Sequence, residues 1–372
     1  MTTPASPTTP DPVGMVGMVG TVGVISVLPL TGIPEVREGD DLADVVTDGL
    51  AHAGLRLEDG DVVVVSSKIA SKSLGLVTHD PDKDRVVHAE TEYVVAERSL
   101  GDRVTRVVRA KAGPIMAAAG VDGSNTGDRG GWLLLPHDPD GICAELHDAL
   151  VARHGVRLGV VLSDTAGRPW RVGQVDFALG AHGVRALDDL RGAVDADGKP
   201  LEVTTRCVAD EVAAAADLAK GKVSAVPVAV VRGLVGALVD EPLTAHPRGR
   251  DLVRTGPGDW FGYGRVEAVR AALGVEPGSA DALSVGIAPA GPDTRVDAVS
   301  RAVRAALHGV ESATADVGPL TVTLGADTAY ELGRATARFE VALWAEGLRG
   351  EADVPAADGL SVLVHVSAAE VR

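Results

Sequence analysis

Residues 61–72 read DVVVVSSKIASK, and residues 158–171 read LGVVLSDTAGRPWR. In each stretch a short run of apolar, β-branched residues passes directly into a polar and charged segment. Such runs predict buried strands, here at about Val62–Val65 and Leu158–Leu162. Ligands are often bound where buried strands end in an open sheet. The two stretches therefore predict two buried strands, each followed by a segment that could carry chemistry.

The rest of the chain alternates between helical and extended patterns with modest loops, which predicts a mixed α/β or α+β fold. Further strands are expected at Val22–Leu28, Trp132–Leu135, Val226–Val231, Leu320–Leu324 and Leu360–His365. Helices are expected at Leu42–Ala53, Glu90–Arg98, Ile142–His154, Asp210–Lys220, Val266–Leu273, Val296–His308 and Thr328–Leu348. We find no internal repeat.

Composition shifts suggest three segments. Residues 1–20 are rich in Thr, Pro and Gly, and we expect a disordered leader there. Pro and Gly cluster in Asp240–Gly258, which predicts a boundary between a first domain at residues 21–250 and a small α/β domain at residues 256–372. The uncharged stretch Val13–Leu30 is interrupted by glycines and preceded by no basic residue, so it predicts neither a signal peptide nor a membrane span.

The charge balance excludes one broad class of function. The 372 residues include 35 Lys+Arg and 52 Asp+Glu, a formal net charge of −17. General nucleic-acid binding needs a basic surface, so it is not expected. Two cysteines, Cys143 and Cys207, are too few for a disulfide framework. We therefore expect a cytoplasmic protein that acts on small molecules.

Three segments carry reactive side chains, although the chain has no P-loop, Rossmann or nucleophile-elbow motif. Ser66–Lys72 offers two lysines and three hydroxyls to a phosphate, or else it is a strand exit whose lysines are solvated. Asp122-Gly123-Ser124-Asn125 offers a carboxylate to a hard cation, or else forms an Asx turn.

The third segment begins with Asp164-Thr165. Their oxygens suit Mg²⁺ or Mn²⁺, and Arg168 and Arg171 add guanidinium groups for anionic oxygens. The alternative is a helix N-cap at Asp164 with surface arginines. Carboxylates, lysines and arginines together indicate phosphoryl transfer.

Seven segments, in this order, resemble coenzyme F420-0:L-glutamate ligases over residues 24–238. They are Leu28–Glu35, Gly39–Leu42, Ser71-Lys72, Ala119–Asn125, Leu135-Pro136 with Asp138–Asp140, Ser163–Arg171 and Cys207–Glu211. The resemblance implies a GTP-dependent enzyme in coenzyme F420 biosynthesis, with an unusual α+β fold and an intertwined homodimer. It implies that GTP phosphorylates the carboxylate of coenzyme F420-0, and that the acyl phosphate then reacts with L-glutamate. Further γ-linked glutamates can follow.

The resemblance also implies site residues and ions. Asp122 and Asp164 would hold one Mg²⁺ or Mn²⁺, and Thr165 a second, with K⁺ as a further ion. GTP would contact the residues Thr31, Gly32, Ile33, Pro34, Ser67, Lys68, Lys72, Asn125, Gly221 and Lys222, and the loop Leu218–Ala225 would close over it. Arg168 and Arg171 are the catalytic candidates, with a general anion-binding role.

The chain departs from the family pattern in three places, one of which is a short loop between Lys72 and Asp122. Lys222 aligns where archaeal members carry an acidic metal ligand, so either the second metal site is lost or the lysine supplies its charge. Residues 256–372 are too short for the complete flavin-binding, nitroreductase-like domain of actinobacterial relatives, so no flavin is expected. Two alternatives stay open: a ligase that uses another phosphorylated carboxylate acceptor, and a nucleotide-binding regulatory protein without turnover.

Overall fold

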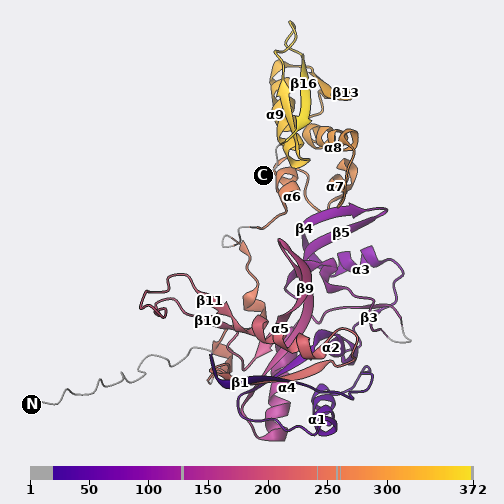
Figure 1. The fold of residues 1–372 in the computed structure, drawn as a ribbon. Coiled ribbons are helices and arrows are strands. Elements are labelled where there is room, and N and C mark those ends of the chain that lie inside the picture. The colour runs from indigo at the N-terminus through magenta and orange to yellow at the C-terminus, as the bar shows by residue number, and fades with distance from the viewer. Residues whose placement is uncertain (1–19, 127–129, 241, 257–258, 260, 370–372) are drawn as a thin grey trace, which may run out of the picture. The chain divides into compact units, whose positions relative to one another are not determined.

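The computed structural model describes residues 20–126, 130–240, 242–256, 259 and 261–369 (Figure 1). Apart from residue 20, the expected disordered leader lies outside this range. The chain divides into two compact units. The first runs to residue 81 and includes 112–114 and 122–253, and the second comprises 82–111, 115–121 and 254–372. The second unit thus includes residues 82–111 and 115–121, which the sequence analysis grouped with the first domain.

A five-stranded sheet forms the centre of the first unit. Its strands, in spatial order, are β1 (Gly20–Pro29), β12 (Val228–Val235), β2 (Asp61–Ser66), β8 (Leu158–Arg168) and β9 (Arg171–His182). Only β2 and β8 pair in parallel; the other neighbours in this sheet are antiparallel. This mixed sheet confirms the coarse expectation of an α+β fold and the predicted strands in β2, β8 and β12.

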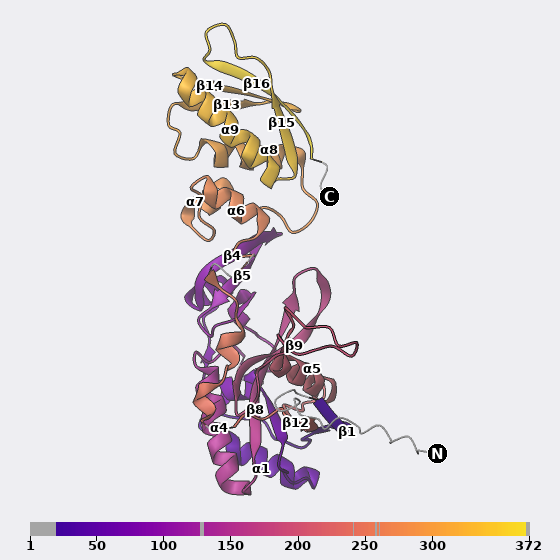
Figure 2. The same ribbon diagram turned by 90° about the vertical axis from the view of Figure 1, so that its left-hand side faces the viewer.

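Helices cover both faces of this sheet. Successive side chains of a strand point to opposite faces, and Val62 to Val65 are all fully buried. Val62 and Val64 share a core with Val212 of helix α5 (Val208–Lys220). Helix α4 (Pro139–His154) packs on β8 and β9, and Figure 2 shows α4 and α5 on opposite sides of the sheet.

Local signals explain where the helices begin and end. Helix α1 (Leu42–Ala53) has the predicted bounds, because the Asp41 carboxylate accepts hydrogen bonds from the Ala43 and Asp44 amides and Gly54 ends the helix at φ 64°. Helix α2 (Ser67–Ser73) follows β2 without a loop. The smaller elements are β3 (Val77–Thr78), β7 (Trp132–Leu133), β10 (Leu187–Asp189), β11 (Thr205–Cys207) and the 3₁₀ turns η3 (Leu243–Ala245) and η4 (Gly249–Leu252).

The second unit corrects one predicted element. Residues 91–100 form strand β4 (Thr91–Leu100) rather than a helix at Glu90–Arg98, which was wrong. Strand β4 pairs with β5 (Arg103–Ala110) through a turn at Gly101, whose φ is 61°. Paired β-branched and aromatic residues such as Tyr93 and Val94 favour a strand despite the charges. The neighbouring elements are α3 (Lys83–Ala89), β6 (Ile115–Ala117) and the 3₁₀ turn η1 (Ala118–Gly120).

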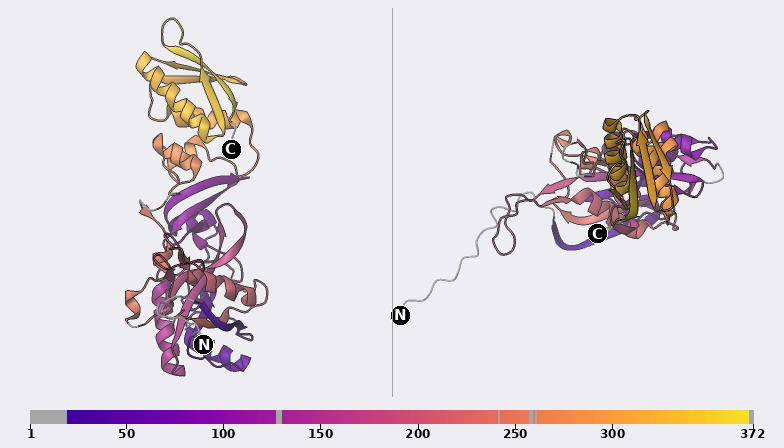
Figure 3. Two further views of the ribbon diagram at one scale, coloured as in Figure 1. Left: turned by 60° about the vertical axis from the view of Figure 1, so that its left-hand side comes forward. Right: turned by 90° about the horizontal axis from the view of Figure 1, so that it is seen from above.

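The remainder of the second unit is a four-stranded antiparallel sheet with helices packed on one face. The strand order is β13 (Ala313–Val317), β14 (Thr321–Ala326), β16 (Ser361–Ala368) and β15 (Leu348–Ala352). The helices are α6 (Arg265–Ala272), α7 (Ala280–Val285), α8 (Arg295–Leu307) and α9 (Ala329–Ala345). Phe339 of α9 is fully buried in their common core, and the right-hand view of Figure 3 shows helices along one side of these strands.

None of the helices in the described part of the chain is long and apolar enough to cross a membrane.

Candidate functional site

The two stretches that carry the predicted chemistry lie side by side. Strands β2 and β8 pair in parallel register, with Val65 opposite Leu162 and Ser66 opposite Ser163. Because neighbouring parallel strands run in the same direction, the polar residues toward the end of each of them meet at one edge of the sheet. The sequence predicted the two strands but not their pairing, which brings both segments to one edge.

Helix α2 fixes the side chains that follow β2. Ser67 is 1 % exposed and Lys72 is 8 % exposed, so neither lies in bulk water. The Nζ of Lys72 lies 2.5 Å from Oε1 of Glu35, and the Nζ of Lys68 lies 2.5 Å from Oδ2 of Asp122. For Lys72 the alternative of a solvated strand exit is therefore wrong, whereas the Lys68 side chain is paired with Asp122 and stays 27% exposed.

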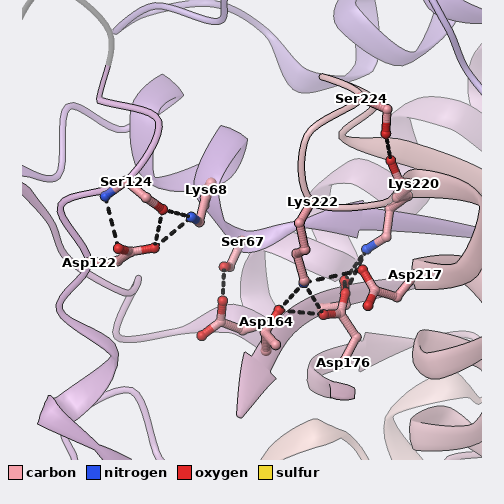
Figure 4. Close-up of polar contacts among 12 residues, drawn as sticks. Ser67, Lys68, Asp122, Ser124, Asp164, Asp176, Asp217, Lys220, Lys222 and Ser224 are labelled. Carbon is pink, nitrogen blue, oxygen red and sulfur yellow. Dashed lines mark hydrogen bonds and ion pairs between the residues drawn. The ribbon is translucent and has the colours of Figure 1, made fainter. Parts of the chain in front are cut away.

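Asp164 lies within strand β8, which continues through Arg168 instead of ending at Leu162. An N-cap role is therefore wrong. The Ser67 hydroxyl donates a hydrogen bond to Oδ1 of Asp164, with the oxygens 3.0 Å apart (Figure 4). Burial raises the pKa of Asp164 to about 6, and the nearby charge of Asp176 adds to the shift. Asp164 is thus a carboxylate whose ionised form is poorly compensated.

Asp122 is better compensated than Asp164. Its Oδ1 accepts from the Ser124 amide at 2.9 Å, which is the Asx turn of the alternative interpretation. Its Oδ2 accepts from the Ser124 hydroxyl at 2.7 Å as well as from Lys68 (Figure 4). Partial burial opposes these contacts, but the hydrogen bonds from Lys68 and Ser124 lower the pKa of Asp122. Lys68 also acts electrostatically on Asp164, so one ammonium group serves both carboxylates.

A third carboxylate, Asp176, was missed by sequence reasoning. It lies on β9 directly opposite Thr165 of β8, and it is 4 % exposed. Its Oδ2 accepts from the Ser163 hydroxyl at 3.0 Å and its Oδ1 from the Thr165 hydroxyl at 2.5 Å. The sequence offered one signal for Asp176. If residues 163–171 begin a hairpin, Asp176, eleven residues after Thr165, can lie across from Thr165.

Two lysines from the end of α5 and the loop after it complete the surroundings of Asp176. Lys220 is 3 % exposed, and its Nζ lies 2.9 Å from Oδ2 of Asp176 and 2.6 Å from Oγ of Ser163. The Nζ of Lys222 lies 3.0 Å from Oδ1 of Asp176 and donates to the Thr165 hydroxyl. Burial acts against ionisation, yet the charge of Lys220 and the hydrogen bonds from Thr165, Lys220 and Lys222 lower the pKa of Asp176 to about 2.

The other predicted site residues lie in four places. Thr31 to Pro34 follow β1, and Gly32 adopts φ 76° in close contact with the ring of His52, where a Cβ would lie 2.3 Å from the His52 Cδ2. Asn125 follows the Asx turn at φ 57°, and Gly221 follows α5 at φ 63°. Arg168 and Arg171 face each other at the exposed end of the β8–β9 hairpin, beyond Thr165.

The donors around Asp122 and Asp164 are of the chemical type that suits a divalent cation. Among the described residues around the site, the four carboxylates of Asp122, Asp164, Asp176 and Asp217 face three ammonium groups, those of Lys68, Lys220 and Lys222. Asp122 and Asp164 already share the influence of the Lys68 charge, so a cation beside them would compensate charge that the chain leaves uncompensated. Carboxylate oxygens are the ligands that Mg²⁺ and Mn²⁺ prefer.

Comparisons with known proteins identify the family of the chain. The family model described as F420-0:Gamma-glutamyl ligase matches residues 32–233. The coenzyme F420:L-glutamate ligase of Archaeoglobus fulgidus is 39% identical over 221 residues, covering 55% of this chain and 86% of the relative. The enzymes of the same name from Haloarcula marismortui and Methanothermobacter thermautotrophicus are each 36% identical, over 54% of this chain and 84% and 86% of their own length. The chain therefore belongs to the F420-0:gamma-glutamyl ligase family.

Proposed function

We propose that the protein is a GTP-dependent ligase that joins L-glutamate to coenzyme F420-0 in coenzyme F420 biosynthesis. Membership of the family supports an amide-forming ligase acting on this pair of substrates. The observation that carries the proposal is the position of Asp164: a poorly compensated carboxylate that accepts from Ser67 at the edge shared by β2 and β8, under the electrostatic influence of Lys68, which pairs with Asp122.

The reaction has two steps. A carboxylate oxygen of coenzyme F420-0 attacks the γ-phosphorus of GTP, the bond to the β-phosphate oxygen breaks, and GDP leaves. The amine nitrogen of L-glutamate then attacks the acyl carbon, inorganic phosphate leaves, and the nitrogen loses a proton to solvent. The protein contributes by positioning these crowded anions and neutralising their charge.

Each site residue has a role in this scheme. Lys68 and Lys72 lie one helical turn apart on α2. Their ammonium groups can exchange their partners, Asp122 and Glu35, for phosphate oxygens of GTP. Asp122 and Asp164 would hold the divalent cation, which neutralises phosphate charge when bound. Thr31 to Pro34 and Asn125 are proposed to contact GTP, and Arg168 and Arg171 are proposed to bind anionic groups of the substrates.

Incubation with GTP, Mn²⁺, L-glutamate and coenzyme F420-0, followed by mass spectrometry, tests the proposal. We expect GDP, phosphate and a product heavier by one or more glutamyl residues. GDP release that requires a different carboxylate acceptor would instead show a ligase of other specificity. GTP binding without GDP release under any of these conditions would show a nucleotide-binding protein and overturn the proposal.

A further inference from the structure

The surroundings of Asp176 and Thr165 differ from those of Asp122 and Asp164 in how fully their oxygens are occupied. Asp122 accepts three hydrogen bonds from Lys68 and Ser124, and Asp164 has Ser67 as its side-chain donor, whereas Asp176 has four donors. Each carboxylate oxygen of Asp176 accepts from one hydroxyl and one lysine. The Oδ1 is shared by Thr165 and Lys222, and the Oδ2 by Ser163 and Lys220. A carboxylate has about four lone-pair positions. Among the described residues, these four donors therefore leave Asp176 no free oxygen for a metal ion.

Thr165 is occupied in the same way. Its hydroxyl donates its proton to Asp176 and accepts a hydrogen bond from Lys222. A divalent ion on the remaining lone pair would lie within a few ångströms of the Lys222 ammonium, and like charges at that distance repel strongly in a partly buried site. The position beside Thr165 is therefore taken by an ammonium group.

The ammonium of Lys222 is fixed there by its partners. Its Nζ lies 3.0 Å from Asp176 and 3.2 Å from Oδ1 of Asp217 on α5, while its side chain remains 57% exposed. Lys220 is buried and forms an ion pair with Oδ2 of Asp176, so it helps to hold the carboxylate in place. Asp176 thus links the loop after α5 to the strand that carries Asp164.

We propose that Lys222, held by Asp176, supplies the second positive charge of the nucleotide site as an ammonium, so that the chain binds a single divalent cation and Thr165 ligates none. The inference rests on the proposed function, because it assumes that the cation and the nucleotide bind beside Asp122 and Asp164. Asp176 and Lys222 are positioning residues in this account.

The test counts Mn²⁺ ions bound per chain in the presence of GDP, from the electron paramagnetic resonance signal of free Mn²⁺. We expect one for the wild-type chain. In Lys222→Ala the oxygens of Thr165 and Asp176 are released from the ammonium, and we expect the count to rise from one to two. The double variant Lys222→Ala/Asp176→Asn lacks the carboxylate, so its count should return to one.

Lys199→Ala is the matched control, because it removes one exposed lysine outside this cluster and should leave the count at one. Circular dichroism establishes that each variant is folded. A wild-type count of two, or a Lys222→Ala count that stays at one, would overturn the inference while leaving the proposed function intact. A wild-type count of zero would remove the proposed cation and this inference together.

Discussion

Two aspartates of the site differ in how well their charge is compensated. Asp122 accepts hydrogen bonds from an ammonium, a hydroxyl and an amide, whereas Asp164 has Ser67 as its side-chain hydrogen-bond donor. Burial consequently dominates at Asp164 and raises its pKa to about 6, while the pKa of Asp122 is lowered. A cation bound between them would matter more to Asp164.

Replacement of the Asp164 carboxylate should therefore abolish turnover and leave the fold intact. In Asp164→Asn the amide keeps the size of the side chain and can still accept from Ser67, but it cannot neutralise a divalent cation. We expect GDP release to fall by roughly a hundredfold or more, as is usual for loss of a charged catalytic group. Steady-state GDP release checks this, and a rate within a factor of two of wild type would contradict it.

The same variant should have a distinctive pH dependence of stability. The folded pKa of Asp164, about 6, lies above its ordinary value of 3.8, so the folded wild-type chain holds this proton more tightly and loses stability as the pH rises from about 4 to 6. The amide of the variant does not ionise, so the variant escapes this loss. In metal-free buffer the variant and wild type should have nearly the same Tm at pH 4. Above pH 6 the Tm of Asp164→Asn should exceed that of wild type by its largest margin.

Asp122→Asn should show the opposite pH dependence of stability. The folded pKa of Asp122 is lowered, so its contribution to stability is present above the unfolded pKa and is lost as the solution is acidified. Its Tm deficit relative to wild type should be greatest at neutral pH and shrink in acid. Thermal unfolding between about pH 3 and pH 8 measures both series, and parallel curves for the two variants would refute the assignment.

At the scale of elements, helix α2 connects the sheet to the loop after β1. It starts directly where β2 ends, and Lys72 in its last turn reaches Glu35, which follows Pro34 of that loop. The ion pair thereby joins two of the segments proposed to bind GTP. Its charge-assisted hydrogen bond is largely buried on the lysine side, where such contacts are stronger than at the surface.

Loss of the Lys72 ammonium should weaken phosphate binding specifically. For Lys72→Ala we expect the Kd for GTP to rise roughly tenfold to a hundredfold, the range for a hydrogen bond to a charged group, with the Kd for guanosine unchanged. Isothermal titration calorimetry with both ligands measures this. Equal weakening for guanosine would point to a disturbed loop instead of a lost phosphate contact.

The elements also show what the sequence can predict. Helix α1 has the predicted bounds because its caps are local: Asp41 and Gly54 specify them without reference to the rest of the chain. Strand β4 was not predicted, because its charged residues gain partners only when β5 and Glu267 of α6 are in place. Asp176 was not predicted either, since its importance arises from pairing across a hairpin whose register the sequence does not display.

At the scale of the whole molecule, each compact unit has its own core. The first is built around α5 and the strands β2, β8 and β12, and the second around α8, α9 and their sheet. Units with separate cores can unfold separately, so a single two-state transition is not expected for this chain. The homodimer implied by the family resemblance stays a prediction that analytical ultracentrifugation can test.

A core substitution in the second unit should leave the nucleotide site unchanged. Phe339 is fully buried, and Phe339→Ala should cost about 3–5 kcal/mol in the unfolding of that unit. Differential scanning calorimetry should show one transition moved to lower temperature and the other unmoved, with the Kd for GTP as in wild type. Val63→Ala, in the sheet of the first unit, should move the other transition.

The way in which the second unit is assembled from distant residues has a consequence for biosynthesis. Residues 82–111 leave the ribosome long before the residues from 254 onward that complete their unit. At usual translation speeds the stretch between them takes on the order of 10–30 s to make. During that interval we expect the hairpin of β4 and β5 to expose apolar surface that its later partners have yet to cover, and exposed surface of this kind is what chaperones bind.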